Sequence, residues 1–183
     1  AAPQALVFLD EAYADFSGQT MIEDAATGRI PNLVVGRTFA KAFGLAGLRV
    51  GALVSSAATL APIRRAVLPY TLNAYAAAAL PAAIDDREYY EWYLEEVRES
   101  KRLLYDTLAR AGVRFWPSDG NFVLACFGDD LVRVVASLAE RGINIRDRSR
   151  DPGCAGCARI TAGVLEHTRR LITALEEVLC GER

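Results

Sequence analysis

The sequence predicts an α/β protein: part of a large, mostly parallel sheet with helices, followed by a small α+β domain. Short apolar runs in the first half end at polar residues, as buried strands of a parallel sheet do. A long amphipathic helical pattern covers residues 85–111, and shorter strand and helix patterns alternate after it. We therefore expect two domains, residues 1–85 and residues 86–183, with the long helix as the connector.

The first half contains three strand patterns. The run Ala5–Asp10 is typical of a fully buried strand with a carboxylate at its carboxyl end, where open α/β sheets bind ligands. Residues 32–38 and 48–55 predict the second and third strands, and a glycine-rich segment joins them. Residues 18–31 form a turn-rich connection with room for a short helix. Further helices are expected at residues 57–67 and 73–84.

In the second half, the long helix has apolar residues at spacings of three and four and charged residues on its other face. Gly112 follows it as a stop signal. The remaining patterns form a compact α+β unit. They predict strands at 113–116, 121–127, 143–146 and 159–162, and helices at 130–141 and 165–179.

Composition excludes several classes of partner. The chain has 183 residues, 52% of them hydrophobic, with a formal net charge of −2 and a pI near 5.5. It therefore has no general attraction to nucleic acid or to an anionic membrane. No apolar run approaches the ~20 residues of a membrane span, and the start carries no signal-peptide pattern. We expect a cytoplasmic protein. Because the chain lacks an initiator Met and enters a strand pattern almost at once, we also expect the later part of a longer protein.

The cysteines and the histidine predict no metal site. Structural zinc needs four ligands, and the pair Cys154 and Cys157 has only His167 and two distant cysteines to add. In a cytosolic protein the four cysteines are expected to be reduced. The pair is therefore interpreted as a reduced loop turn, with an adventitious disulfide as the alternative. His167, the only histidine, is expected at the surface.

Lys41 is the residue whose setting most suggests chemistry. Of 21 Lys and Arg residues, only Lys41 and Lys101 are lysine. Arginine stays protonated, whereas a lysine among apolar neighbours can lose its proton and attack a carbonyl. Phe39 and Phe43 flank Lys41, and glycines nearby allow close backbone approach. The alternative is an ordinary solvated lysine in a loop.

The residues around Lys41 resemble the signature of fold-type I pyridoxal-phosphate aminotransferases. The matching segments are residues 10–13 (Asp-Glu-Ala-Tyr) and residues 37–51, which contain Lys41. Together with residues 145–149 and 156–163, they are similar to the histidinol-phosphate aminotransferase family. The resemblance runs over essentially the whole chain but starts midway through that family's large domain.

The resemblance implies pyridoxal 5′-phosphate as cofactor. Lys41 would bind it covalently and carry a proton during the reaction. Asp10 would pair with the pyridine nitrogen, and Tyr13 would donate to a ring oxygen. Thr38 and Arg49 match the family's phosphate ligands. Taken alone, Asp10 is better explained as a turn or helix-cap residue, and Tyr13 as a packed core or rim side chain.

One position departs from the family and three more match its substrate contacts. Ala40 stands where the family commonly has serine, which removes one phosphate hydroxyl. Arg159 matches the arginine that binds the substrate α-carboxylate. Arg146 matches a second substrate-contacting arginine, with a solvated strand end as an equal alternative. Asn121 resembles a residue of a substrate-site motif, although a turn asparagine is the preferred interpretation.

The implied reaction is transamination between histidinol phosphate and 2-oxoglutarate, giving glutamate, in histidine biosynthesis. The family's usual state is a homodimer. Two further enzyme classes stay open: threonine-phosphate decarboxylase and an aromatic aminotransferase. A non-catalytic remnant or assembly module is the alternative outside the enzymes. Because the family's first strands have no counterpart, we expect the isolated chain to be inactive and its sheet to have an unpaired edge.

Overall fold

The computed structural model describes residues 4–180, except for the side chain of Cys180. The chain divides into two compact units, Ala1–Glu91 and Trp92–Arg183, and the division falls within a single helix. Each unit is described by itself below. The mixed strand and helix content agrees with the predicted α/β fold class.

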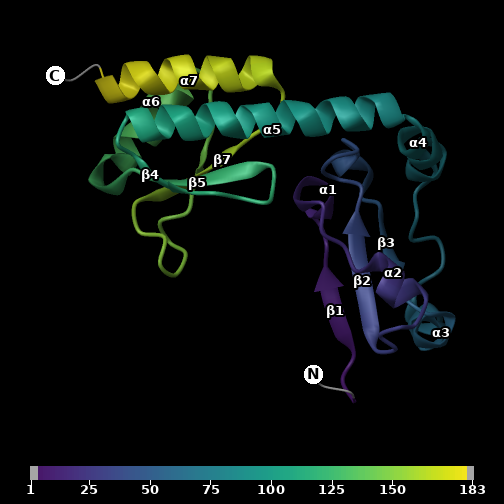
Figure 1. Ribbon diagram of the computed structural model, residues 1–183. Helices are drawn as coiled ribbons and strands as arrows, with labels where there is room; N and C mark the ends of the chain where they lie inside the picture. Colours follow the sequence, from purple (N-terminus) through teal and green to yellow (C-terminus); the bar gives the residue numbers. More distant parts are fainter. Residues whose placement is uncertain (1–3, 181–183) are drawn as a thin grey trace. The chain divides into compact units, whose positions relative to one another are not determined.

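The first unit contains a three-stranded sheet with the order β1-β2-β3 (Figure 1). Its strands are β1 (Val7–Asp10), β2 (Leu33–Thr38) and β3 (Gly51–Val54). Strand β1 pairs in parallel with β2, and β3 pairs with β2 in the antiparallel direction. The other elements are α1 (Ala14–Ser17), α2 (Ile22–Ala26), η1 (Ala46–Leu48), α3 (Ala57–Ala66), α4 (Ala74–Asp85) and the first turn of α5 (Arg87–Arg110).

Helix α2 covers one face of this sheet. Ala25 of α2 packs with Leu33 and Val35 of β2 in a buried cluster that Leu9 and Val54 extend. These sheet residues alternate with residues that face the other way, because successive side chains of a strand point to opposite faces. The cluster under α2 therefore covers only one face of the sheet.

The prediction that β1 is fully buried was wrong. Val7 and Phe8 expose 42% and 59% of their surface, and Leu9 is the partly buried residue that reaches the core. Among the described strands β1 pairs only with β2. The apolar run correctly predicted a strand, but burial depends on what covers both faces, which a single run does not specify.

The third strand is shorter than the predicted 48–55. Leu48 closes the 3-10 turn η1, and Arg49 follows in the left-handed region with φ 52°. Regular pairing therefore begins only at Gly51. The short helix expected within residues 18–31 is confirmed by α2.

The second unit contains a four-stranded antiparallel sheet with the order β4-β5-β7-β6. Its strands are β4 (Arg114–Trp116), β5 (Phe122–Cys126), β6 (Arg146–Asp147) and β7 (Cys157–Thr161). The turn η2 (Gly128–Asp130) and the helices α6 (Leu131–Glu140) and α7 (Leu165–Cys180) complete this unit with the rest of α5.

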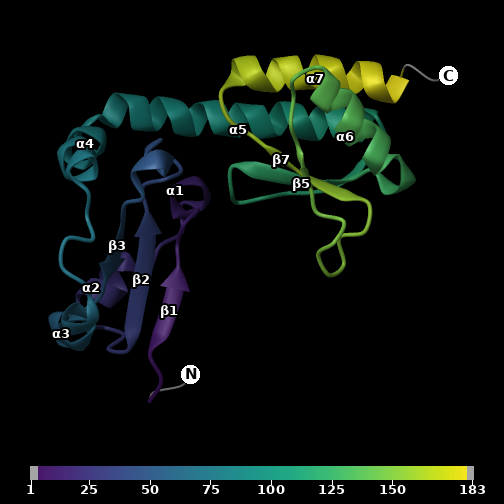
Figure 2. The same cartoon turned by 180° about the vertical axis from the view of Figure 1, so that it is seen from behind.

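Helices α5 and α7 lie side by side on one face of this sheet in both views (Figures 1 and 2). The backbone N–H of Leu165, at the start of α7, donates to Glu96 of α5 at 2.7 Å. The buried Ser100 of α5 donates to the Gly163 carbonyl at 2.7 Å. The core between helices and sheet contains Val97, Leu104, Leu108, Val123, Ala125, Val134, Leu138, Ile160 and Leu175.

The strand predicted at residues 143–146 is displaced. The N–H of Ile143 donates to the Leu138 carbonyl at 2.9 Å and so finishes the C-terminal end of α6. Only Arg146 and Asp147 pair with β7. Among the described residues, no helix is both long and apolar enough to cross a membrane.

Candidate active site

Asp10 and Thr38 lie on the same face of the first sheet. Asp10 is opposite Gly36 across the parallel pair, and Thr38 is two residues farther along β2. Both line a hollow of about 260 Å³ at the carboxyl ends of β1 and β2. The Asp10 carboxylate also accepts a hydrogen bond from the Ala12 N–H at 3.0 Å. The structure therefore brings a carboxylate and a hydroxyl together at the sheet edge where the sequence places them.

Two glycines open this hollow. A Cβ on Gly51 would lie 2.7 Å from the Arg37 carbonyl oxygen, and a Cβ on Gly36 would lie 2.5 Å from the Phe8 ring. Both residues line the hollow, so side chains there would occupy its space.

Lys41 lies in the loop that follows β2. The loop is closed by two hydrogen bonds, from Leu45 N–H to the Phe39 carbonyl at 3.0 Å and from Phe39 N–H to the Val50 carbonyl at 3.3 Å. Lys41 is partly buried. Its Nζ atom lies 5.3 Å from the centre of the Tyr13 ring, within the range of a cation–π contact. The structure thus brings the predicted lysine and the predicted tyrosine together.

Aromatic rings hold the Lys41 loop in place. The Phe39 and Phe43 rings pack edge to face with centres 5.3 Å apart. Phe43 packs in turn on Tyr90, with ring centres 4.9 Å apart. The residues on either side of Lys41 are therefore anchored by apolar contacts, while the amine points to Tyr13.

A buried ionic network lies beside the loop. Arg37 donates to Glu11 at 3.1 Å and to Asp15 at 2.5 Å. Glu11 also accepts from the Thr20 hydroxyl at 2.7 Å. The Tyr90 hydroxyl donates to the same Asp15 oxygen at 3.0 Å. The network connects β1, α1, β2 and the first turn of α5.

The network shifts two pKa values in opposite directions. Burial by itself raises the pKa of Glu11, but hydrogen bonds from the Met21 N–H, Thr20 and Arg37 outweigh it and leave the pKa below its usual value. Burial, together with the neighbouring Asp15 carboxylate, raises the pKa of Tyr90 to about 12. At neutral pH Glu11 is therefore ionised and Tyr90 is neutral.

Arg49 is placed differently from the other predicted cofactor residues. It is exposed, and its guanidinium donates to the Ala46 carbonyl at 3.1 Å. It does not line the hollow of Asp10 and Thr38. Asn73 supports its turn from outside, because its amide nitrogen donates to the Leu48 carbonyl at 2.8 Å. The Asn73 Oδ1 atom accepts from Ala76 N–H at 2.8 Å and caps α4.

The predicted substrate residues belong to the second unit. Arg146 and Arg159 are direct partners across β6 and β7 and therefore share one face of that sheet. The Arg159 guanidinium lies over the Phe122 ring, 5.4 Å from its centre. Asn121 comes just before β5, and its carbonyl accepts from the Ala162 N–H at 2.9 Å. The two arginines place two cations on one face of the sheet, and Asn121 contributes to the sheet through its backbone.

The second lysine has a structural role. Lys101 donates to the Ser118 carbonyl at 2.8 Å, and burial lowers its pKa. The Tyr105 hydroxyl accepts from the Ser118 N–H at 3.0 Å. Lys101 thus holds the turn before β5.

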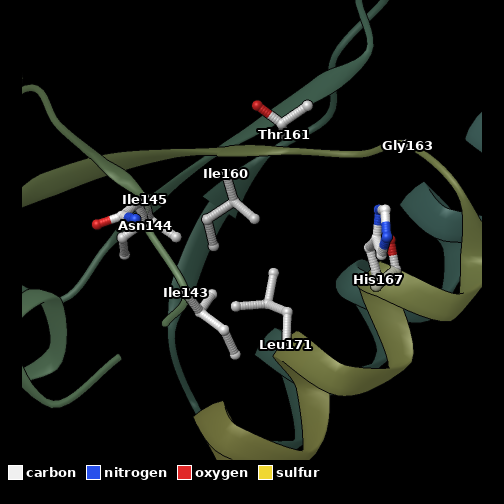
Figure 3. Close-up of a pocket in the computed structure, with 9 residues that line it drawn as sticks. Ile143, Asn144, Ile145, Ile160, Thr161, Gly163, His167 and Leu171 are labelled. Carbon is white, nitrogen blue, oxygen red and sulfur yellow. The ribbon is translucent and has the colours of Figure 1, made fainter. Parts of the chain in front are cut away.

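A separate pocket of about 210 Å³ in the second unit holds none of the predicted site residues (Figure 3). It is lined by Ile143, Ile145, Ile160, His167 and Leu171, among others. His167 is exposed, as expected. Within residues 4–180, no group of three or more His, Cys, Asp or Glu residues could hold a metal ion.

No role was predicted for the network of Arg37, Glu11, Asp15 and Tyr90. Two of its members stand next to predicted site residues, since Glu11 follows Asp10 and Arg37 precedes Thr38. The sequence did contain a signal for Glu11 and Arg37. Neighbouring strand residues point to opposite faces, so these two side chains are expected to point away from those of Asp10 and Thr38. Tyr90 and Asp15 are 75 positions apart, and only the fold shows their contact.

Comparison with known proteins identifies the family. The sequence matches the family described as aminotransferase class I and II over residues 1–175. The chain belongs to this family. A curated relative of this aminotransferase chain, the histidinol-phosphate aminotransferase of Symbiobacterium thermophilum, is 37% identical over 177 residues. The match covers 97% of the chain and 49% of that protein, so the chain spans about half the length of the curated relatives it matches.

Two solved structures have the same fold as this aminotransferase chain. Histidinol-phosphate aminotransferase from Sinorhizobium meliloti, in complex with pyridoxal-5′-phosphate, has a TM-score of 0.84 and 29% identity over 99% of this chain and 50% of that one. L-threonine-O-3-phosphate decarboxylase from Porphyromonas gingivalis has a TM-score of 0.76 and 26% identity over 97% of this chain and 56% of that one. The predicted fold class is confirmed.

Proposed function

We propose that this chain provides cofactor-binding and substrate-binding residues of a pyridoxal-phosphate-dependent aminotransferase that converts histidinol phosphate with 2-oxoglutarate. The observation that carries the proposal is the hollow lined by Asp10 and Thr38, with Lys41 in the following loop. The 37% identity to a histidinol-phosphate aminotransferase supports this substrate. Because the chain matches about half of that relative, the activity of the whole enzyme is part of the proposal.

The residues of the first unit fit the cofactor. When bound, pyridoxal phosphate supplies a protonated ring that stabilises negative charge at the substrate α-carbon. Asp10 would hold the proton on the ring nitrogen. Lys41 would hold the cofactor covalently and move a proton at the substrate α-carbon. Thr38 and Arg49 would bind the phosphate, and Tyr13 would orient the ring through its hydroxyl.

The paired arginines of the second unit suit a substrate with two anionic groups. Arg159 would bind the α-carboxylate through a bidentate fork, and Arg146 would bind the phosphate. Like charges directly opposite each other in a sheet repel, so an anion bound between them removes an unfavourable interaction. Asn121 would contact the substrate beside them. We place the enzyme in histidine biosynthesis, as a cytoplasmic homodimer.

Attachment of the cofactor is tested with the chain itself. After incubation with pyridoxal phosphate and reduction with borohydride, mass spectrometry should find the label on Lys41. Labelling should saturate with cofactor concentration and fall in Asp10→Asn and Arg49→Ala variants. Lys101, the only other lysine, is the internal control. Labelling confined to Lys101, or equal on both lysines, contradicts the proposal.

A phosphate-bearing amino acid decarboxylase is the second candidate, and the likeness to L-threonine-O-3-phosphate decarboxylase supports it. In a protein of the relatives' full length that carries this sequence, glutamate formation from 2-oxoglutarate with histidinol phosphate distinguishes the aminotransferase from an enzyme that releases CO₂ from threonine phosphate. Aromatic amino acids as amine donors test the aromatic aminotransferase. A chain that labels at Lys41 but binds none of these amines would be the non-catalytic alternative.

A further inference from the structure

Cys126 and Cys157 are direct partners at one end of the β5 and β7 pair. The flanking hydrogen bond runs from Phe127 N–H to the Gly156 carbonyl at 2.8 Å. In an antiparallel ladder this makes Cys126 and Cys157 a non-hydrogen-bonded pair, with Cα atoms about 4.5 Å apart. A disulfide accepts Cα separations of about 4.4–6.8 Å. The register therefore allows the two sulfur atoms to join without backbone movement.

The two thiols also point to one place. Cys126 Sγ lies 3.8 Å and Cys157 Sγ lies 3.7 Å from the carbonyl oxygen of Ala155. Both side chains are free thiols. Cys157 is 2% exposed, whereas Cys126 is partly exposed. Burial, followed by a hydrogen bond with the Cys126 thiol, raises the pKa of Cys157 to about 11. Of the two, Cys126 is the one that a dissolved reagent reaches.

Cys154 is the competing partner for Cys157. The turn between them is held by a hydrogen bond of 2.9 Å from Cys157 N–H to the Cys154 carbonyl. A Cβ on Gly156 would lie 2.7 Å from Gly128 Cα, so the turn is packed closely against the neighbouring backbone. This packing resists the adjustment that a bridge across the turn requires, whereas the cross-strand pair already has a suitable register.

We propose that Cys126 and Cys157 form a site of reversible disulfide exchange with small disulfides such as oxidised glutathione. The Cys126 thiolate attacks one sulfur of oxidised glutathione, the S–S bond breaks, and one glutathione leaves. The Cys157 thiol gives its proton to solvent and attacks the Cys126 sulfur, which releases the second glutathione. The two cysteines lose two electrons, and oxidised glutathione becomes two reduced molecules. This inference does not depend on the proposed function.

The bridge is detected by peptide mapping in a Cys180→Ser background. The protein is equilibrated with oxidised glutathione, alkylated, and cut with trypsin without reduction. A Cys126–Cys157 bridge joins residues 115–133 to residues 151–159, whereas a Cys154–Cys157 bridge lies within residues 151–159. We expect the joined pair, on monomeric protein, and its loss on adding dithiothreitol.

Single variants assign the bridge. Cys154→Ser should keep the joined pair, and Cys126→Ser should abolish it, because residues 115–133 then contain no cysteine. Because Cys157 is buried, Cys157→Ala is used only if its circular dichroism matches that of the parent protein. Loss of the pair in Cys154→Ser, a dominant bridge within residues 151–159, or glutathione adducts without a bridge would each overturn the proposal.

Discussion

The Arg37 guanidinium lies 2.5 Å from Asp15 and 3.1 Å from Glu11, so one cation bridges two carboxylates. The exposed side-chain fractions are 19% for Arg37, 3% for Asp15 and 6% for Glu11. Removing one member of a buried ionic group leaves the other charges without compensation, which costs more than the group contributes by being present. The sheet that carries the Lys41 loop should therefore tolerate the loss of one member of this network poorly.

Replacing Arg37 should destabilise the protein strongly. We expect Arg37→Met to lower the free energy of unfolding by about 3–5 kcal/mol, because the Asp15 and Glu11 carboxylates then stay buried without a cationic partner. Arg29→Met is the matched control, since Arg29 pairs with Glu23 and Asp24 but is 62% exposed. It should cost less than about 1 kcal/mol. Urea unfolding measures both, and similar losses in the two variants would contradict the assignment.

Glu11 should make stability depend on acid pH. Its pKa in the folded protein is lowered from 4.5, so its stabilising contribution is present above that value and is lost as the pH falls through the folded pKa. As the pH falls below 4.5, the unfolding free energy of the parent protein should therefore drop more steeply than that of Glu11→Gln. Parallel curves would show that Glu11 is not the group involved.

The Tyr90 hydroxyl should lose its proton only at strongly alkaline pH. Its pKa is raised from 10.0 to about 12, so its contribution to stability is fully present below pH 10 and is lost as the pH rises toward about 12. Absorbance titration of the tyrosinate should show a component near pH 12 that disappears in Tyr90→Phe. The variant should also lose about 1 kcal/mol at neutral pH, since Asp15 loses a donor. An unchanged titration curve would refute the prediction.

The two glycines of the hollow should differ in tolerance. Gly51→Ala brings a Cβ to 2.7 Å from a backbone oxygen, so we expect a loss of about 1–3 kcal/mol. Gly36→Ala should cost less, because the partly exposed Phe8 ring that it meets can rotate away. Gly47→Ala is the control, with nothing within 4 Å of its Cβ. Thermal unfolding ranks the three, and a Gly47 effect as large as that of Gly51 would contradict the geometry.

The periodic elements could be predicted from sequence, and the exceptions have physical causes. The long helix was expected at residues 85–111 and is found at Arg87–Arg110, because a stripe of apolar residues and a final glycine define it locally. The third strand was expected from residue 48. Arg49 instead adopts a positive φ, which is uncommon for any residue but glycine, so alternation along the sequence predicted a strand too early.

The candidate site also has a part that could be predicted from the sequence and a part that could not. The strand pattern placed Asp10 at a carboxyl end, and Thr38 was expected near the cofactor only through the family resemblance. The register brings both residues around one hollow. The contact between Tyr90 and Asp15 could not be predicted, because it depends on how α5 begins relative to the sheet. The roles of Lys41 and Arg159 stay predictions that the labelling and substrate assays test.

Deamidation of Asn73 should weaken the turn that contains Arg49. The Asn73 amide oxygen caps α4 while its amide nitrogen holds the Leu48 carbonyl. Deamidation of this side chain to a carboxylate would keep the acceptor, and the new negative charge would favour the helix N-terminus. The donor would be lost, and the carboxylate would then face a carbonyl oxygen. Stored protein would therefore keep its helix content while the turn loosens, and faster tryptic cleavage after Arg49 would reveal it.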